Sequence, residues 1–270
     1  MLTFLFWNLN GKPLQATVAN LVKAHEVDIL VLAECGVAPA TFLSTLNEEG
    51  RAQFDFPFSE CAAIAIYTRF PGRVLTPLKE SDRFTIRTLA LPARPEILLG
   101  AAHLPSKLHR GPLGQAFGCA EFAGALREVE DGVGHRRTVL LGDLNMNPFE
   151  PGVTAAPGLN GVMTREIALR GPRFAEKTAY PFFYNPMWGL FGDGTDGPAG
   201  TYYRSSSQPE TTFWNIYDQI LIRPDLLPHF DNRSLRILSD DGVRNLVTKR
   251  GIPDSKEFSD HLPVMFQLGL

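Results

Sequence analysis

The sequence predicts a mixed α/β fold that forms one domain over residues 1–270. Short apolar runs that resemble buried strands recur along the chain, and several of them end in a polar side chain. Segments with helical spacing of apolar residues lie between some of these runs, whereas Pro, Gly and charged residues separate others in the manner of antiparallel turns. At 44% hydrophobic residues, the chain can bury a core of two or more layers, and no internal repeat divides it.

The strand and helix assignments follow from these periodicities. Helices are expected over 14–25, 39–48 and 114–130. In the last of these, Phe117, Phe122, Ala125 and Val129 are predicted to form the buried side. Strands are expected over 4–7, 29–33, 62–68, 73–78, 84–91, 97–102, 139–143, 201–204, 213–222, 235–238 and 262–268. The first strand, helix and second strand make a βαβ-like unit, although the pattern does not decide whether its two strands are neighbours.

Residues 147–200 break this pattern, because Pro, Gly and aromatic residues replace the periodic runs. Disordered segments are poor in aromatic residues, so we expect an ordered insertion. Its rings suit two readings equally well. They form a wall beside a functional site, or they cover a sheet edge.

Polar side chains follow four of the predicted strands. The run 139–145 reads Val-Leu-Leu-Gly-Asp-Leu-Asn, so Gly142 is expected to give a tight exit at which Asp143 and Asn145 emerge. Polar residues at the ends of α/β strands are often catalytic, although a lone aspartate there more often caps a turn. The same design recurs elsewhere in the chain, at Asn8 and Asn10, at Glu34 and at His103. Ser259, Asp260 and His261 instead open the last apolar run.

Asp218 has an unusual position, since it lies within the apolar run 216–222. A buried carboxylate without a partner would cost several kcal/mol. The sequence therefore predicts that a polar or cationic side chain contacts Asp218.

Taken in order, these residues resemble the motifs of the endonuclease/exonuclease/phosphatase superfamily, which has the DNase I-like fold. The matching positions are Asn8, Glu34, His103, Asp143, Asn145, Asp218, Asp260 and His261. The resemblance implies a four-layered α/β sandwich with two central, mostly antiparallel sheets. It also implies hydrolysis of phosphate esters with a divalent metal, usually Mg²⁺, with Mn²⁺ as the other candidate. Gathering the four acidic residues at one end of a sheet would be repulsive without such a cation.

The resemblance also implies roles for individual residues. Glu34 is the first candidate for a metal ligand, with Asn8 assisting and Asn10 and Asp260 close by. Asp143 would orient or deprotonate the attacking water, and Asn145 would help to place it. His261 would donate to the phosphate while Asp218 holds its other ring nitrogen, and His103 would act as general acid or phosphate donor.

The leading functional prediction is a metal-dependent phosphodiesterase that acts as a nuclease on DNA or RNA, with single-stranded or flexible substrates favoured. Asn10, Lys107, Arg110, Trp188 and Trp214 are the candidate substrate-binding residues. Further rings that could stack on bases are Phe191, Tyr202 and Tyr203. A solvated basic turn formed by Lys107, His109 and Arg110 is an equally good reading of the cations.

Two other function classes stay open at this point. A phosphatase or phosphodiesterase for a small nucleotide, phospholipid or inositol phosphate suits the net charge of −3 and the lack of a long basic stripe. A non-catalytic binding module is disfavoured, because a degenerate site would usually have lost one of the matching residues. The charge balance excludes a strongly basic protein that coats nucleic acid.

The cysteine content and the first residues of the chain bear on where in the cell the protein is located. Cys35, Cys61 and Cys119 are odd in number and far apart, which argues against a zinc site or a disulfide framework and favours a reducing, cytoplasmic setting. The apolar start of the chain is too short for a signal peptide or a membrane span, so no membrane anchor is expected. The sequence identifies no protein partner.

Overall fold

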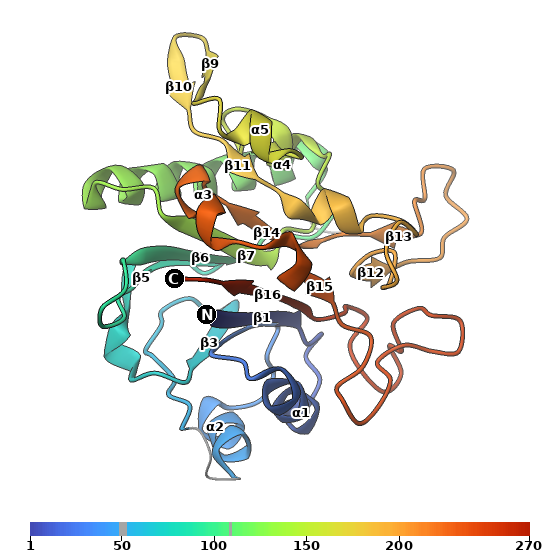
Figure 1. The fold of residues 1–270 in the computed structure, drawn as a ribbon. Coiled ribbons are helices and arrows are strands. Elements are labelled where there is room, and N and C mark those ends of the chain that lie inside the picture. Colours follow the sequence, from blue (N-terminus) through green and yellow to red (C-terminus); the bar gives the residue numbers. More distant parts are fainter. Residues whose placement is uncertain (49–52, 108–109) are drawn as a thin grey trace.

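The computed structural model describes residues 1–48, 53–107 and 110–270. His109 of the predicted basic turn and part of the segment after the second helix lie outside this range. Two sheets pack face to face, and helices cover both outer faces, so that the molecule has four layers (Figure 1). This confirms the predicted α/β sandwich.

The first sheet has five strands and the second has seven. In spatial order the first contains β15 (Arg236–Ile237), β16 (Val264–Leu268), β1 (Leu2–Asn8), β2 (Ile29–Ala33) and β3 (Ile64–Thr68). The second contains β4 (Leu75–Glu80), β5 (Phe84–Leu89), β6 (Ile97–His103), β7 (Thr138–Asp143), β14 (Asp218–Ile222), β11 (Phe183–Tyr184) and β8 (Gly161–Val162). Most neighbouring strands run antiparallel, as expected.

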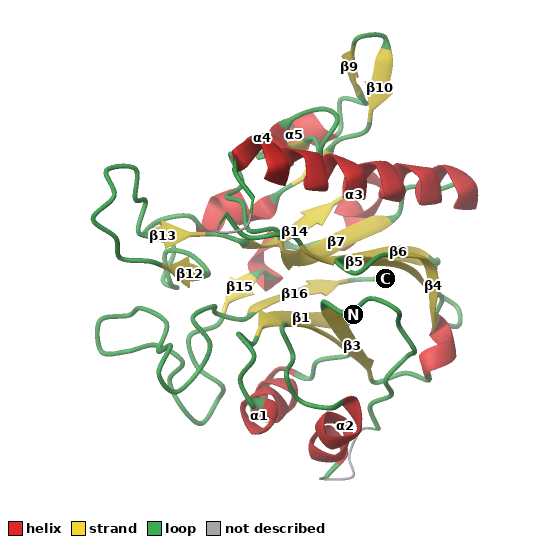
Figure 2. Ribbon diagram, turned by 180° about the vertical axis from the view of Figure 1, so that it is seen from behind, coloured by secondary structure: helices red, strands yellow, loops and turns green. Residues whose placement is uncertain are grey.

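Helices α1 (Gln15–His25) and α2 (Pro39–Asn47) cover the first sheet, and α3 (Pro112–Val133), α4 (Pro151–Thr154) and α5 (Arg165–Ala168) cover the second (Figure 2). Short 3₁₀ helices connect several strands: η1 (Gly72–Val74), η2 (Pro186–Leu190), η3 (Pro224–His229) and η4 (Asn232–Ser234). Two small hairpins stand apart from the large sheets: β9 (Arg173–Ala175) with β10 (Thr178–Tyr180), and β12 (Tyr202–Tyr203) with β13 (Trp214–Asn215). Within the described ranges, no helix is long and apolar enough to span a membrane.

Each sheet contains a long parallel pair whose strands are joined by a helix, and the second sheet also has the short parallel pair β8–β11. β1 and β2 are neighbours with Asn8 opposite Ala33, and β6 and β7 are neighbours with His103 opposite Asp143. The carboxyl ends of a parallel pair lie at the same edge, which is where α/β sheets carry their sites. The polar residues that follow these four strands are therefore brought to one edge of the sandwich.

The central strands alternate between two apolar cores. Val139, Leu141 and Ile220 pack toward the first sheet, whereas Leu140 and Leu221 pack toward α3. This period of two is the expected pattern for strands buried on both faces. It fixes the register of β7, and with it the position of Asp143 at the strand end.

The structure corrects several sequence-based expectations. Phe117 does not belong to the buried side of α3, because 67% of its surface is exposed. The expected strand 213–222 is divided between β13 and β14, and the strand expected over 235–238 is reduced to β15. Residues 147–200 are not simply inserted, since β8 and β11 extend the second sheet. Gly142 lies within β7 instead of forming an exit turn.

Candidate active site

Asn8 connects the two parallel pairs, which belong to different sheets. Its side-chain Nδ2 donates to Oδ2 of Asp143 at 2.9 Å and to Oε1 of Glu34 at 3.1 Å. Its Oδ1 accepts the backbone N–H of Asn10 at 2.9 Å. The amide therefore lies between the two carboxylates and offers both of them hydrogen, which reduces their repulsion.

Three site residues adopt left-handed backbone conformations within two residues of a strand end. The φ angles are 51° at Asn10, 49° at Glu34 and 51° at Asn145. Such angles are uncommon outside glycine, and they cluster where a side chain must be held in one direction. The loops hold one another in place, because the N–H of Gly11 donates to the carbonyl of Glu34.

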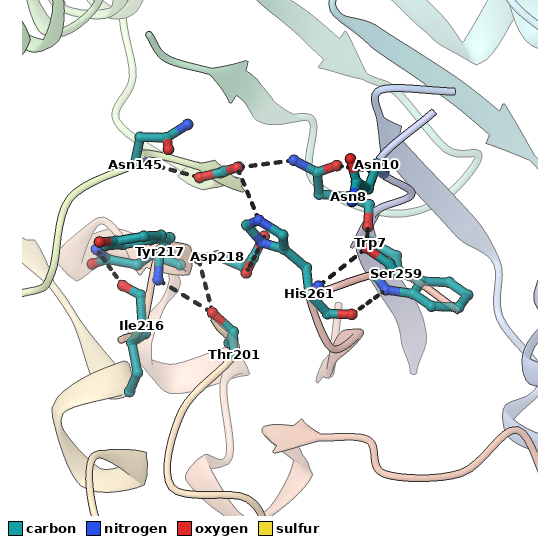
Figure 3. A network of polar contacts seen from close by, with 12 residues as sticks. Trp7, Asn8, Asn10, Asn145, Thr201, Ile216, Tyr217, Asp218, Ser259 and His261 are labelled. Carbon is teal, nitrogen blue, oxygen red and sulfur yellow. Dashed lines mark hydrogen bonds and ion pairs between the residues drawn. The ribbon is translucent and has the colours of Figure 1, made fainter. Parts of the chain in front are cut away.

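Asp218 has the partner that its burial required. Nδ1 of His261 lies 2.8 Å from Oδ2 and 3.1 Å from Oδ1 of Asp218. Backbone N–H groups of Tyr217 and Asp218 also donate to the hydroxyl of Thr201 (Figure 3). Burial lowers the pKa of His261, but the carboxylates of Asp218, Asp143 and Asp260 outweigh it and raise that pKa to about 10. The imidazole is thus held protonated at neutral pH.

The segment that carries His261 is anchored to the end of β1. Nε1 of Trp7 donates to the carbonyl of His261 at 2.9 Å, and the hydroxyl of Ser259 donates to the carbonyl of Asn8 at 2.6 Å (Figure 3). The same hydroxyl accepts the N–H of His261. These bonds fix His261 relative to Asn8, although the two residues are far apart in the sequence.

His103 also approaches the carboxylates of Glu34 and Asp143. Its Nε2 is 3.4 Å from Oε1 of Glu34 and 3.8 Å from Oδ2 of Asp143. Nε2 of His261 lies 3.9 Å from the same Oδ2 atom. Two imidazoles therefore approach Asp143 from two directions, at distances longer than a hydrogen bond.

Asn145 is held by its surroundings. Its N–H donates to Oδ1 of Asp143 at 2.8 Å, and its Nδ2 donates to the carbonyl of Leu104 at 2.9 Å. Nε2 of Gln115 in α3 donates to the carbonyl of Asn145 at 2.9 Å. The amide oxygen of Asn145 therefore remains as the acceptor that faces the site.

These groups surround a cavity of about 400 Å³, which we call the catalytic pocket. Its lining includes Glu34, His103, Asp143, Asn145, Asp260 and His261 from the predicted set. Asn10 and Lys107 line it as well, whereas Arg110, Trp188 and Trp214 do not. The structure thus brings most of the predicted residues together.

Lys107 is already engaged, because its ammonium group pairs with the carboxylate of Glu150 and lies 5.3 Å from the ring centre of Tyr217. Arg110 instead lines a neighbouring cavity.

Trp188 packs near Phe149 at 6.2 Å between ring centres, and Trp214 contacts the edge of Tyr203 at 5.3 Å. Among the rings of 147–200, Phe183 and Tyr184 are buried in β11 and belong to the core rather than to a site wall.

Four lining residues of the catalytic pocket were not predicted from the sequence. Arg83 and Arg204 contribute guanidinium groups, and Ser106 and Tyr217 complete the lining. Tyr202, which was expected only as a stacking residue, packs against His261 at 4.8 Å and stacks on Tyr217 at 5.2 Å. An isolated β-bridge between Tyr202 and His261 brings these two tyrosine rings to the site. No local sequence pattern predicts such a contact.

Residues 5–261 match the Endonuclease/Exonuclease/phosphatase family. The chain belongs to this family. As its name indicates, this is a family of phosphoesterases that includes nucleases and phosphatases. No curated protein shows significant sequence similarity to the chain.

Solved structures with the same fold include members that act on nucleic acid. The endonuclease domain of TRAS1, a telomere-specific non-LTR retrotransposon, is 17% identical, with a TM-score of 0.56 and coverage of 100% of this chain and 99% of that chain. TDP2 of D. rerio, complexed with single-strand DNA product, is 12% identical, with a TM-score of 0.55 and coverage of 98% and 97%. The 3′ phosphatase NExo from Neisseria, bound to product DNA hairpin, is 15% identical, with a TM-score of 0.56 and coverage of 99% and 99%. At these identities the likeness shows the fold alone.

The donor set of this family member fits a hard divalent cation. Oδ1 of Asp260 is buried without a hydrogen-bond partner among the described residues, and such an orphaned oxygen requires a donor or a cation. The side chain of Glu34 is 41% exposed, which leaves room for water ligands. Asp143, Asp218 and His261 also lie close enough to share an ion, but the His261–Asp218 hydrogen bond already occupies two of those groups.

Proposed function

We propose that the protein is a divalent-metal-dependent phosphodiesterase that hydrolyses nucleic acid. One observation carries this proposal: the carboxylates of Glu34, Asp143 and Asp260 and the imidazoles of His103 and His261 line one pocket. Acidic oxygens for a cation and positioned proton donors are the two requirements of metal-assisted attack on phosphorus. The nucleic-acid complexes of TDP2 and NExo support the substrate class.

Glu34 and Asp260 would hold the metal, with Mg²⁺ as first choice and Mn²⁺ as the alternative. A cation at these oxygens would supply Lewis acidity to the phosphoryl group and lower the pKa of a water molecule. Asn8 is better suited to a positioning role than to ligation. Its amide hydrogens face the carboxylates, and its oxygen accepts the Asn10 N–H.

Asp143 is the proposed base that orients and deprotonates the attacking water. Oδ1 is held by the N–H of Asn145 and Oδ2 by the amide of Asn8, so that the carboxylate cannot rotate. The free amide oxygen of Asn145 is an acceptor that can help to orient the same water. A positioned base of this kind is worth about two to four powers of ten in rate.

The two histidines are the proposed donors to the phosphate. Asp218 holds Nδ1 of His261, which leaves the Nε2 hydrogen directed toward Asp143 and the pocket. The raised pKa of His261 keeps that hydrogen in place at neutral pH. His103 lines the same pocket and suits donation to a second phosphoryl oxygen or to the leaving group.

The flanking phosphates of a polymer would contact Arg83 and Arg204. Both guanidinium groups line the pocket, and neither has an ion-pair or hydrogen-bond partner among the residues that the structure describes. The stacked rings of Tyr202 and Tyr217 suit an unpaired base more than a regular duplex. We therefore propose single-stranded or flexible nucleic acid as substrate, with Trp188 and Trp214 as stacking residues outside the pocket.

The test compares single-stranded DNA, duplex DNA, RNA and bis(p-nitrophenyl) phosphate, with Mg²⁺ or Mn²⁺, with chelator and with Asp143→Asn. We expect cleavage of a polymer that both chelation and Asp143→Asn abolish. Asp225→Asn, at an exposed site in η3, is the matched control and should cleave normally. Cleavage that persists with chelator would contradict the proposal.

A second candidate is hydrolysis of a small phosphoester, such as a nucleotide or an inositol phosphate. The pairing of Lys107 with Glu150 favours it, because one of the three lysine and arginine side chains that line the pocket is already neutralised. Activity on the small ester that oligonucleotides do not inhibit would support this candidate. We propose a reducing, cytoplasmic setting in either case, since Cys35, Cys61 and Cys119 are free thiols.

A further inference from the structure

A second cavity adjoins the catalytic pocket. It has a volume of about 300 Å³, which is at the lower end of the range for ligand sites. Arg83 lines both cavities, and its carbonyl accepts the N–H of His103 at 2.9 Å. The segment after β6 separates them, with Leu104 and Pro105 on one side and Ser106 and Lys107 on the other. We call this second cavity the side pocket.

The side pocket combines an apolar wall with a polar rim. Phe84, Leu104 and Pro105 provide the wall, and the ring of Phe84 is held by Phe122 at 4.8 Å between ring centres. The rim carries the carboxylates of Asp82 and Glu121 as well as the guanidinium of Arg110. Two carboxylates repel a phosphate group, but they accept hydrogen bonds from the edge of a nucleobase.

Two glycines of α3 lie beside the side pocket, next to the side chain of Arg110. Gly118 lines it, and a Cβ atom at this position would meet only Nη1 of Arg110, at 3.8 Å. Gly114, one turn earlier, lies under the same arginine side chain. Each glycine inside a helix costs about 1 kcal/mol relative to alanine. The two glycines therefore leave room for the Arg110 side chain at the rim of the side pocket.

We propose that the side pocket binds the base of the nucleotide next to the scissile phosphate, while Arg83 contacts the phosphate between the two pockets. The apolar wall would contact the face of the base, and the rim would contact its edge. This inference rests on the proposed function. It adds that the preferred substrate is longer than one nucleotide.

The experiment fills the side pocket with Gly118→Leu and uses Gly132→Leu as the matched control. Gly132 lies in the same helix with no atom within 4 Å of an added Cβ, so both variants gain the same helix propensity. On a single-stranded oligonucleotide, Gly118→Leu should lower kcat/KM at least about tenfold relative to the control. On bis(p-nitrophenyl) phosphate, which has no base, the two variants should agree within about twofold.

A binding measurement gives an independent readout in chelator. The Asp143→Asn protein, with and without Gly118→Leu or Gly132→Leu, is titrated against a fluorescein-labelled oligothymidylate and an abasic oligomer of equal length. We expect Gly118→Leu to weaken binding of oligothymidylate about tenfold and to leave the abasic oligomer unchanged. Equal losses for both oligomers, or no difference from Gly132→Leu, would overturn the base-binding assignment alone. Failure of the parent protein to bind or cleave any polymer would overturn the proposed function as well.

Discussion

Asp143 and Asp218 lie directly opposite each other across the β7–β14 ladder, but only Asp218 forms a hydrogen bond with a histidine. Asp218 contacts Nδ1 of His261 at 2.8 Å, while Asp143 stays 3.9 Å from Nε2 of the same ring. One carboxylate is thereby committed to the imidazole, and the other remains free for chemistry. Two neighbouring carboxylates whose environments differ in this way often have different roles in catalysis.

Replacing Asp143 by Asn should abolish hydrolysis without unfolding the protein. Asn145 donates to Oδ1 and Asn8 to Oδ2, so an asparagine keeps only one of these two hydrogen bonds, and it cannot take a proton. We expect kcat to fall by about 10²–10⁴. Steady-state kinetics and the melting temperature, each compared with Asp225→Asn, test this. A fall of less than about tenfold in kcat would remove Asp143 from the role of base.

His261 should titrate far above an ordinary histidine in the metal-free protein. NMR titration in chelator is expected to give a pKa near 10, because the surrounding carboxylates outweigh burial. In Asp218→Asn the pKa should fall toward 6.5. His25 serves as an internal control, since burial lowers its pKa and the substitution is remote from it. An unchanged pKa of His261 in Asp218→Asn would contradict the pairing.

The same pKa shift predicts how stability depends on pH. The folded-state pKa lies above the unfolded value of about 6.5, so the protonated imidazole contributes stability that is fully present below pH 6.5. This contribution is lost as the pH rises through 10. The difference in free energy of unfolding between the parent protein and His261→Gln should therefore shrink across this window, as urea titrations at several pH values would reveal.

Divalent metal should stabilise the folded protein through Glu34 and Asp260. A ligand that binds only the folded state adds about 2.7 kcal/mol at a concentration 100 times its Kd. Mg²⁺ or Mn²⁺ should thus raise the melting temperature of the parent protein, and Glu34→Gln or Asp260→Asn should reduce that rise. Glu257→Gln, at an exposed position outside the pocket, provides the control. An identical response in Glu34→Gln and Glu257→Gln would exclude Glu34 as a ligand.

Trp188 and Trp214 should contribute to affinity for single-stranded nucleic acid although they lie outside the catalytic pocket. A stacked base is worth about 1–3 kcal/mol by alanine substitution. We expect Trp188→Ala and Trp214→Ala in the Asp143→Asn protein to weaken binding of a long oligonucleotide. Phe174→Ala, on the exposed β9–β10 hairpin, should leave it unchanged. Unaltered affinity in both tryptophan variants would end their assignment as substrate-binding residues.

The site residues that could be predicted from the sequence share one local feature. Glu34, His103 and Asp143 each end or directly follow an apolar strand, so that the pattern of a short segment is enough to identify them. Asp218 was identified by the opposite feature, a charge inside an apolar run. Its partner, His261, is brought to it by the packing of residues 259–261 against β1. The resemblance to the family predicted this pairing, whereas local sequence patterns could not.

The residues that were missed depend on tertiary placement. Arg83 lies in the turn between β4 and β5, and only the register of β5 on β6 brings it beside His103. Tyr202 reaches the site through its bridge to His261. Phe117 was wrongly assigned to the buried side of α3. The spacing of apolar residues predicts that a helix has a buried face, but it does not define where that face ends. At about 100° per residue, Phe117 lies roughly 140° around α3 from the buried Phe122.

A glycine is needed at position 142, but for a different reason from the one predicted. The sequence suggested a turn, whereas the structure places Gly142 in β7, where an added Cβ would lie 2.0 Å from the carbonyl oxygen of Ala102. Neither backbone can yield, because both belong to the parallel pair that carries His103 and Asp143. Gly142→Ala should therefore cost at least about 3 kcal/mol, the upper end for overpacking, and reduce activity by moving these two residues.

Urea unfolding and steady-state kinetics of Gly142→Ala distinguish these two readings of the glycine. Gly132→Ala, in the open part of α3, is the control and should raise the free energy of unfolding by up to about 1 kcal/mol. A tight turn alone would tolerate alanine with a smaller loss of stability and a normal distance between His103 and Asp143. A stable, fully active Gly142→Ala protein would therefore show that the β6–β7 pair can separate without disturbing the site, contrary to the packing described above.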